Sequence, residues 1–85
     1  MKQFTYIITD ELGIHARPAG LLVKKAAEFQ SSVKIRKGDK EADAKRILNL
    51  MGLAAKKGDA ITFTIEGPDE KDAAEALENF LKEHL

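Results

Sequence analysis

One histidine of the chain lies where its neighbours favour phosphoryl chemistry. His15 stands in the segment Gly13 to Pro18, directly before a predicted helix. The first backbone N–H groups of a helix have no intrahelical partner and carry a partial positive charge, so a helix start binds anions. Arg17 adds a planar fork of N–H donors that suits phosphate oxygens. A neutral imidazole nitrogen has the lone pair that attacks phosphorus, so the pattern predicts histidine phosphorylation. A loop histidine without any chemistry fits the same spacing.

Other chemistries find little support around this histidine. Asp10 and Glu11 lie close to His15, but no second histidine stands at metal-ligand spacing, so we expect no metal and no cofactor. No serine is near enough in the sequence to indicate a nucleophile that His15 activates. The chain has no cysteine, which excludes thiolate nucleophiles, zinc fingers and thiol redox motifs. The other histidine, His84, is expected only to complement the end of the last helix.

A second feature is the segment of residues 47–53, which has more large apolar side chains than two helical turns can bury. If Ile47, Leu50 and Met51 point inward, Leu48 lies on another side of the helix. Leu48 either belongs to an exposed partner surface or packs under the following loop, and the sequence leaves both open. Four basic residues flank the segment and either steer an acidic partner or are simply solvated: Lys45, Arg46, Lys56 and Lys57.

Length, composition and charge restrict the class of protein. An 85-residue chain with 44% hydrophobic residues can form one modest domain, residues 1–85, but not two lobes with a cleft between them. Its 14 basic and 14 acidic side chains give a formal net charge of zero, which argues against a dedicated nucleic-acid binder. No apolar run approaches the ~18 residues that span a bilayer, and the N-terminus turns polar too early for a signal peptide. We therefore expect a cytoplasmic monomer that binds no nucleic acid and does not insert into a membrane.

Hydrophobic periodicity predicts four strands and three helices in the order βαββαβα. The short helix has only about two turns, and the third strand is weak and is expected at an edge. This order predicts an α+β fold, a mostly antiparallel four-stranded sheet with the helices on one face and the other face open to water. The predicted elements are strand 3–9, helix 16–29, strands 33–36 and 40–44, helix 47–51, strand 60–66 and helix 69–84.

Each long element has an apolar side that we expect in the core. The first helix contributes Ala19, Leu22, Val23, Ala26 and Phe29, the last strand Ile61, Phe63 and Ile65, and the last helix Ala73, Leu77, Phe80 and Leu81. An RNA-binding sheet would need aromatic residues on its open face. All five aromatic residues are expected to point inward instead: Phe4, Tyr6, Phe29, Phe63 and Phe80.

Three motifs together resemble the HPr family, the histidine-containing phosphocarriers of the bacterial phosphoenolpyruvate-dependent sugar phosphotransferase system. They are Gly-Ile-His-Ala-Arg-Pro-Ala at residues 13–19, Lys-Arg-Ile-Leu-Asn-Leu-Met at residues 45–51, and Gly-Pro-Asp-Glu at residues 67–70. The resemblance covers essentially the whole chain, and its first motif is highly specific. It implies an open-faced β-sandwich with strand order 1-4-2-3, and it favours phosphorylation of His15 over a histidine without chemistry.

The resemblance also implies a reaction and two partners. Enzyme I would donate a phosphoryl group, originally from phosphoenolpyruvate, to Nδ1 of His15, and His15 would pass it to a sugar-specific enzyme IIA. Arg17 matches the family arginine that helps to hold the phosphoryl group. Catalysis would reside in the partners, so the chain itself would not be an enzyme. The alternative is a paralogue in a nitrogen-related or regulatory branch that is not coupled to sugar transport.

The partner surface of the family lies on the first helix and the short helix. One departure from the family pattern is Arg46, at the position where many Gram-positive members carry a serine that a dedicated HPr kinase phosphorylates. The only serines here are Ser31 and Ser32, so we expect no phosphoserine regulation, and capping of the short helix is expected to fall to Asp43 or to water. The residues matching the partner surface are Arg17, Gly20, Lys24, Ile47, Leu48 and Met51, and Arg46 lies beside them.

Overall fold

Four strands and three helices follow one another in the predicted order βαββαβα. The computed structural model describes residues 1–85. The elements are β1 (Lys2–Ile7), α1 (Ala16–Ala27), β2 (Ser32–Lys37), β3 (Lys40–Asp43), α2 (Ile47–Gly52), β4 (Ala60–Glu66) and α3 (Glu70–His84).

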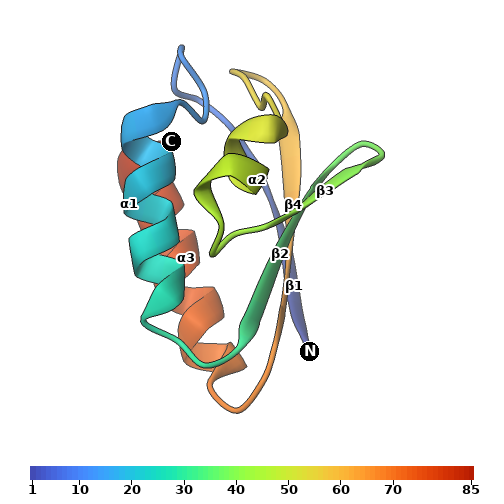
Figure 1. Cartoon of the computed structure of the whole chain (residues 1–85), viewed down its shortest axis with the longest axis vertical. Coiled ribbons are helices and arrows are strands. Elements are labelled where there is room, and N and C mark those ends of the chain that lie inside the picture. The colour runs from blue at the N-terminus through green and yellow to red at the C-terminus, as the bar shows by residue number, and fades with distance from the viewer.

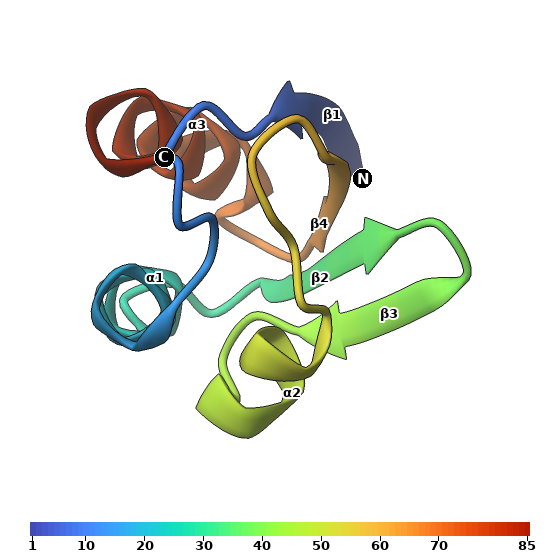
Figure 2. The same cartoon turned by 90° about the horizontal axis from the view of Figure 1, so that it is seen from above.

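The strands form one antiparallel sheet in the order β1-β4-β2-β3. The central strand β4 pairs with β1 on one side, where Phe63 lies opposite Phe4, and with β2 on the other, where Phe63 lies opposite Ile35. Figures 1 and 2 show all three helices on the same face of this sheet. The α+β fold and the strand order that the resemblance implied are confirmed.

The core lies between the sheet and the helices. Alternate residues of β4 face the helices, and Ile61, Phe63 and Ile65 are buried as predicted. The long helices bury the predicted sides, with Ala19, Leu22 and Ala26 from α1 and Ala73, Leu77, Phe80 and Leu81 from α3. Val23 of α1, also predicted in the core, packs against it but is only half-buried. Twenty buried hydrophobic residues form one continuous cluster.

The other face of the sheet is open to water and polar. Its threonines form cross-strand contacts, such as the 3.0 Å hydrogen bond between the hydroxyls of Thr5 and Thr62. The five aromatic side chains pack on the helix side, although the prediction that all point inward was too strong, because Phe4, Tyr6 and Phe29 are only half-buried there. The open face therefore offers no aromatic platform for stacking RNA bases.

β1 and α1 each end two residues earlier than predicted, and β3 ends one residue earlier, at Asp43. At the ends of β1 and α1, other hydrogen bonds take over the backbone. β1 ends at Ile7 instead of Thr9, since the N–H groups of Thr9 and Asp10 donate to the main-chain oxygen of Leu85 at 2.6 and 2.9 Å. Helix α1 ends at Ala27 instead of Phe29, whose N–H closes a tighter three-residue turn on Ala26 at 3.2 Å.

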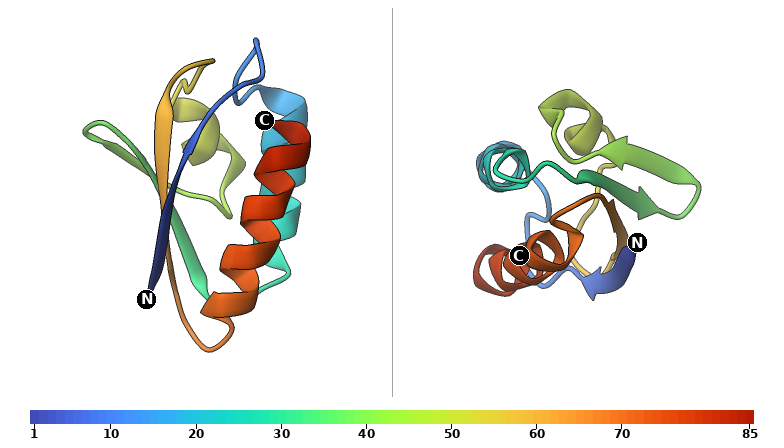
Figure 3. Two further views of the ribbon diagram at one scale, coloured as in Figure 1. Left: turned by 180° about the vertical axis from the view of Figure 1, so that it is seen from behind. Right: turned by 90° about the horizontal axis from the view of Figure 1, so that it is seen from below.

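Helix α3 runs back along the sheet and ends beside the start of α1, as Figure 3 shows from behind. The hydrogen bonds to Leu85 fix this end of α3 against the loop that leads from β1 into α1. None of the helices is long and apolar enough to cross a membrane.

Candidate functional site

His15 is the N-cap residue of α1, and its side chain takes no part in capping. Its backbone is extended, with φ −108° and ψ −176°, and its carbonyl oxygen accepts the first helical hydrogen bond from Ala19 at 2.9 Å. The half-buried imidazole makes no capping hydrogen bond to the helix. Its ring nitrogens therefore remain available for other chemistry.

The start of α1 is suited to an anion. The N–H groups of Ala16 and Arg17 have no carbonyl one turn earlier in the helix to bind. Pro18, which is buried at the third position, has no N–H and so leaves no donor unsatisfied there. No acidic residue lies in this first turn, so nothing in the helix itself opposes a negative charge beside His15.

A cavity of about 190 Å³ opens in front of His15. It brings the predicted pair His15 and Arg17 together, with the guanidinium-bearing side chain of Arg17 exposed to solvent. Its complete lining is Asp10, His15, Arg17, Pro18, Leu21 and His84. No group of three or more His, Cys, Asp or Glu residues lies close enough together to hold a metal ion.

His84 lines this cavity, which the sequence analysis did not predict. It was expected to do no more than complement the end of α3, 69 residues away from His15 in the sequence. No periodicity or motif predicts this position, because it depends on where α3 ends relative to the start of α1. The only sequence signal is its unusual identity, since it is the one other imidazole in the chain.

The loop before His15 is held at a close approach to another loop. Gly13 has φ +68°, a conformation that side chains disfavour, and its N–H donates to the carbonyl of Asp10 at 3.0 Å. The buried Ile14 then donates its N–H to the carbonyl of Ala55 at 3.0 Å. The backbone on both sides of His15 is thus fixed, by this contact and by the start of α1.

The other end of the same loop is tied to α3. The main-chain oxygen of Leu85 accepts hydrogen bonds from the N–H groups of Thr9 and Asp10 and from the hydroxyl of Thr9, the last at 2.8 Å. Leu85 is itself buried and donates its N–H to Leu81 at 2.8 Å. The position of α3 relative to His15 is therefore built into the fold.

Helix α2 presents an apolar surface beside α1. Leu48 is 82% exposed, so it does not pack under the following loop. Of the three apolar residues considered for the inward side, only Leu50 is buried, and Ile47 and Met51 are 40% and 38% exposed. A helix of six residues that contacts the core along one side can bury only one of its large side chains fully.

The residues of α1 and α2 that the sequence analysis grouped do lie on adjoining helices. A Cβ atom added to Gly20 would lie 3.9 Å from Cδ1 of Ile47, which places the two helices in contact at this point. We call the group Arg17, Gly20, Lys24, Arg46, Ile47, Leu48 and Met51 the α1–α2 surface. Leu21 of α1 is also 40% exposed, and it was not predicted as part of any surface.

Arg46 is the N-cap residue of α2, and its side chain is 74% exposed. Its guanidinium Nε lies 3.9 Å from the carboxylate of Asp43, a distance that gives only weak attraction in water. Asp43 does not cap α2 as expected, because its carboxylate accepts the N–H of Lys45 at 2.9 Å, one residue before the N-cap. The carbonyl of Asp43 accepts the N–H of Arg46 at 3.0 Å, so Asp43 stabilises the turn into the helix instead.

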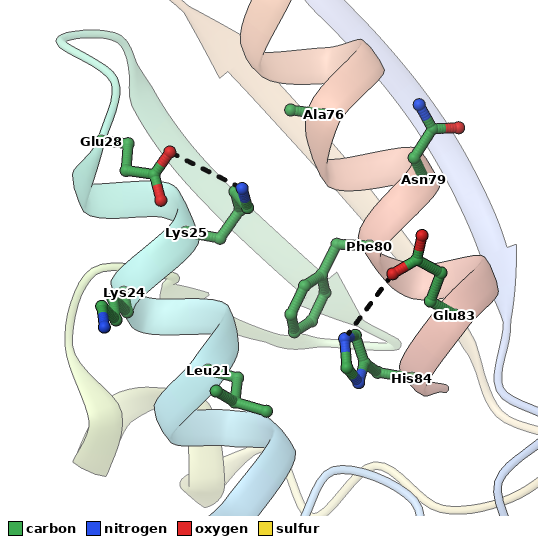
Figure 4. A pocket seen from close by; sticks show the side chains of 9 residues that line it. All are labelled: Leu21, Lys24, Lys25, Glu28, Ala76, Asn79, Phe80, Glu83 and His84. Carbon is green, nitrogen blue, oxygen red and sulfur yellow. Dashed lines mark ion pairs between the residues drawn. The ribbon is translucent and has the colours of Figure 1, made fainter.

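A second cavity, of about 340 Å³, lies between α1 and α3 and is shown in Figure 4. Leu21 and His84 belong to both cavities, so the groove adjoins the space in front of His15. In this groove Lys25 lies 3.6 Å from the carboxylate of Glu28, and Nε2 of His84 lies 3.9 Å from the carboxylate of Glu83.

Comparison with known proteins gives a consistent result. Residues 2–83 match the family described as "PTS HPr component phosphorylation site". The chain is 48% identical over 83 residues to the phosphocarrier protein HPr of Lysinibacillus sphaericus, with 98% of this chain and 94% of that protein covered.

Solved structures agree with the sequence relatives. The histidine-containing phosphocarrier protein of Mycoplasma superposes with a TM-score of 0.94 at 38% identity, covering 96% of this chain and 93% of that one. An HPr dimer from Thermoanaerobacter tengcongensis superposes with a TM-score of 0.78 at 36% identity, covering 98% and 95%. Since that neighbour is a dimer, the expectation of a monomer here stays a prediction.

Proposed function

The chain belongs to the HPr family of phosphocarrier proteins of the phosphotransferase system, and we propose that His15 is the residue that carries its phosphoryl group. Residues 1–85 would act as one HPr-like domain. No feature of the fold or the site favours the alternative of a nitrogen-related or regulatory branch.

The observation that carries the proposal is the environment of the His15 imidazole. The ring makes no capping hydrogen bond, lines a cavity with Arg17, and stands at the start of a helix whose first turn contains no acidic residue. His84 is the only other imidazole, and it lies in the last turn of α3, where the helix has no free backbone N–H groups to hold a phosphoryl group carried on that ring.

The transfer step follows from this arrangement. The lone pair of Nδ1 of His15 forms a bond to phosphorus, the bond between phosphorus and the donor breaks, and its electron pair returns to the donor. The guanidinium of Arg17 and the free N–H groups of Ala16 and Arg17 would stabilise the charge on the phosphoryl oxygens. The return transfer to an acceptor is the same step with the roles exchanged.

We propose enzyme I as the donor and a sugar-specific enzyme IIA as the acceptor, both of which would dock on the α1–α2 surface. The exposed apolar side chain of Leu48 supports this, because α2 carries it two residues after the basic Arg46 and adjoins α1, the helix that carries Lys24. Catalysis would then reside in the partners. A cytoplasmic location accompanies the proposal, because phosphoenolpyruvate, the original donor, is a cytoplasmic metabolite.

The test is incubation with phosphoenolpyruvate and enzyme I, followed by phosphorus NMR. We expect an acid-labile phosphohistidine signal that is lost in His15→Ala, while the folded structure of that variant persists because the side chain is only half-buried. Arg17→Ala should still accept phosphate but at a lower rate. Phosphorylation that persists in His15→Ala and is lost in His84→Ala would show that the site is assigned to the wrong histidine.

A further inference from the structure

We propose that His84 is a second phosphoryl-binding residue of this site, which donates a ring N–H from the end of α3 to the phosphoryl group on His15. The proposal deepens the proposed function and rests on it. It adds one donor, from a different element, to the guanidinium of Arg17.

The first support is the shared cavity. His84 and His15 line the same space of about 190 Å³, one from α3 and one from the start of α1. The side chain of His84 is 40% exposed, so its ring is neither sealed in the core nor free in solvent. Figure 4 shows it at the last turn of α3, across from Leu21 of α1, which also lines the cavity.

The second support is that the ring is held in place. The imidazole lies against the ring of Phe80, with centroids 4.5 Å apart and an angle of 35° between the planes. Phe80 is buried, and Leu85, the residue after His84, is fixed by three hydrogen bonds from the β1–α1 loop. A donor that is already positioned loses little side-chain freedom when an anion arrives.

The third support is that the cavity has few groups that attract an anion. Asp10 and the negative end of α3 both disfavour a phosphoryl group there. Arg17 is the only lysine or arginine that lines the cavity, so a further N–H donor would add to the binding of the phosphoryl group. An imidazole has at least one N–H in either protonation state, so His84 can donate to phosphate whether or not it is charged.

The charged groups of the adjoining groove cannot take the place of His84 as a donor to the phosphoryl group. Lys24, Lys25 and Glu28 line the same groove from α1, and Glu83 precedes His84 on α3. Lys25 is paired with Glu28, and the Glu83 carboxylate lies 3.9 Å from Nε2 of His84. None of these four side chains lines the cavity in front of His15.

A phosphoryl-binding role differs from a docking role in its effect on equilibrium. When enzyme I catalyses transfer from phosphoenolpyruvate, the final phosphorylated fraction at a fixed pyruvate to phosphoenolpyruvate ratio depends only on the free energies of the two forms of this protein. A residue that only assists docking changes the rate of approach to equilibrium and leaves this fraction unchanged. A residue that binds the phosphoryl group changes the equilibrium constant itself.

The experiment measures this equilibrium constant for three variants at one pH. We expect His84→Ala to lower it about fivefold, the effect of losing one hydrogen bond of ordinary net strength. His84→Gln keeps an N–H donor and should recover most of the loss. Asn79→Ala is the matched control, because Asn79 lies on α3 in the adjoining groove but not in the His15 cavity, and it should leave the constant unchanged.

NMR of the unsubstituted protein gives a readout that needs no variant. The ring signals of His84 should move on phosphorylation of His15, while those of Phe29 at the far end of α1 should not. An equilibrium constant for His84→Ala equal to that of the original chain, or an equal loss in Asn79→Ala, overturns the proposal and leaves His15 phosphorylation intact. Absence of any phosphohistidine in the unsubstituted protein overturns the proposed function and this proposal together.

Discussion

Gly13 and Ala55 meet backbone to backbone, with no room for a side chain on Gly13. A Cβ atom there would overlap the carbonyl oxygen of Ala55 and lie 2.6 Å from Cα of Lys56. The same carbonyl oxygen accepts the N–H of Ile14 at 3.0 Å. The α2–β4 loop therefore fixes the backbone that leads into His15, although it contributes no side chain to the site.

Gly13→Ala should destabilise the protein and misplace His15. We expect a loss of about 2–4 kcal/mol in the free energy of unfolding, because the substitution adds a backbone clash to the cost of a positive φ. Urea denaturation measures it, and the rate of phosphate uptake from enzyme I should fall in parallel.

Gly38→Ala is the control for this prediction. Gly38 also has a positive φ, +59°, but a Cβ there meets nothing within 4 Å, so only the conformational cost of about 1 kcal/mol remains. Equal losses for the two variants would mean that the contact with Ala55 has no energetic role.

Leu48→Asp should leave stability almost unchanged and weaken partner binding. The side chain is 82% exposed, so we expect a change in the free energy of unfolding within about 0.5 kcal/mol. If Leu48 is an anchor of the α1–α2 surface, the affinity for enzyme I should fall roughly tenfold or more, as calorimetric titration would measure. Leu50→Ala, in the same helix but fully buried, should instead cost about 2–5 kcal/mol of stability.

Asp69 gives the protein a predictable response to acid. Its carboxylate accepts the hydroxyl of Ser31 at 2.5 Å and the N–H groups of Gln30 and Ser31 at 2.9 Å each. These hydrogen bonds, that of the Ser31 hydroxyl first, lower the pKa of Asp69 below its usual value of 3.8. The unfolded chain therefore binds a proton more readily at this position than the folded protein does.

The stabilisation from Asp69 is present above the unfolded pKa and is lost as the pH falls through the lower, folded value. Asp69→Asn should accordingly lower the melting temperature at pH 7, and the gap to the original protein should narrow below about pH 4. Asp72→Asn, an exposed aspartate in the same helical turn, should show a smaller difference at pH 7. A gap for Asp69→Asn that stays constant down to pH 2 would contradict this assignment.

The regular elements could be predicted where one periodicity covers several residues. Strand β4 alternates strictly and was predicted to its last residue, Glu66, and the apolar side of α3 was predicted in full. Local pattern fails where a distant group competes for the backbone. The end of β1 depends on Leu85, and the turn after α1 depends on Asp69, and neither partner can be found from the neighbouring sequence.

In the candidate site, too, local features could be predicted and features that depend on distant contacts could not. The Gly-Ile-His-Ala-Arg-Pro-Ala motif is local, so the pairing of His15 with Arg17 at a helix start could be predicted. The number of exposed apolar residues on α2 could not, because it depends on how closely a six-residue helix approaches the core. The position of His84 in the His15 cavity follows only from the three-dimensional course of α3.

Arg46 is expected to act on the rate at which enzyme I finds this protein. Its exposed guanidinium is held only loosely by Asp43, so its charge acts at the edge of the α1–α2 surface. A serine at this position could gain about two negative charges by phosphorylation, whereas arginine keeps a fixed positive charge. We therefore expect ATP and an HPr kinase to leave position 46 unmodified.

Arg46→Glu should lower the association rate with enzyme I about fivefold at low ionic strength, because a positive charge beside the docking surface steers an acidic partner face. The difference should fade as salt approaches 1 M, where the screening length is about 3 Å. Lys71→Glu makes the same change in net charge at the start of α3, at the end of the molecule away from α2 in Figure 1, and should have little effect. Stopped-flow mixing measures both association rates. Equal rates for the two variants at low salt would place Arg46 outside the docking surface. The missing serine hydroxyl would then be the only difference at this position from relatives with a regulatory serine.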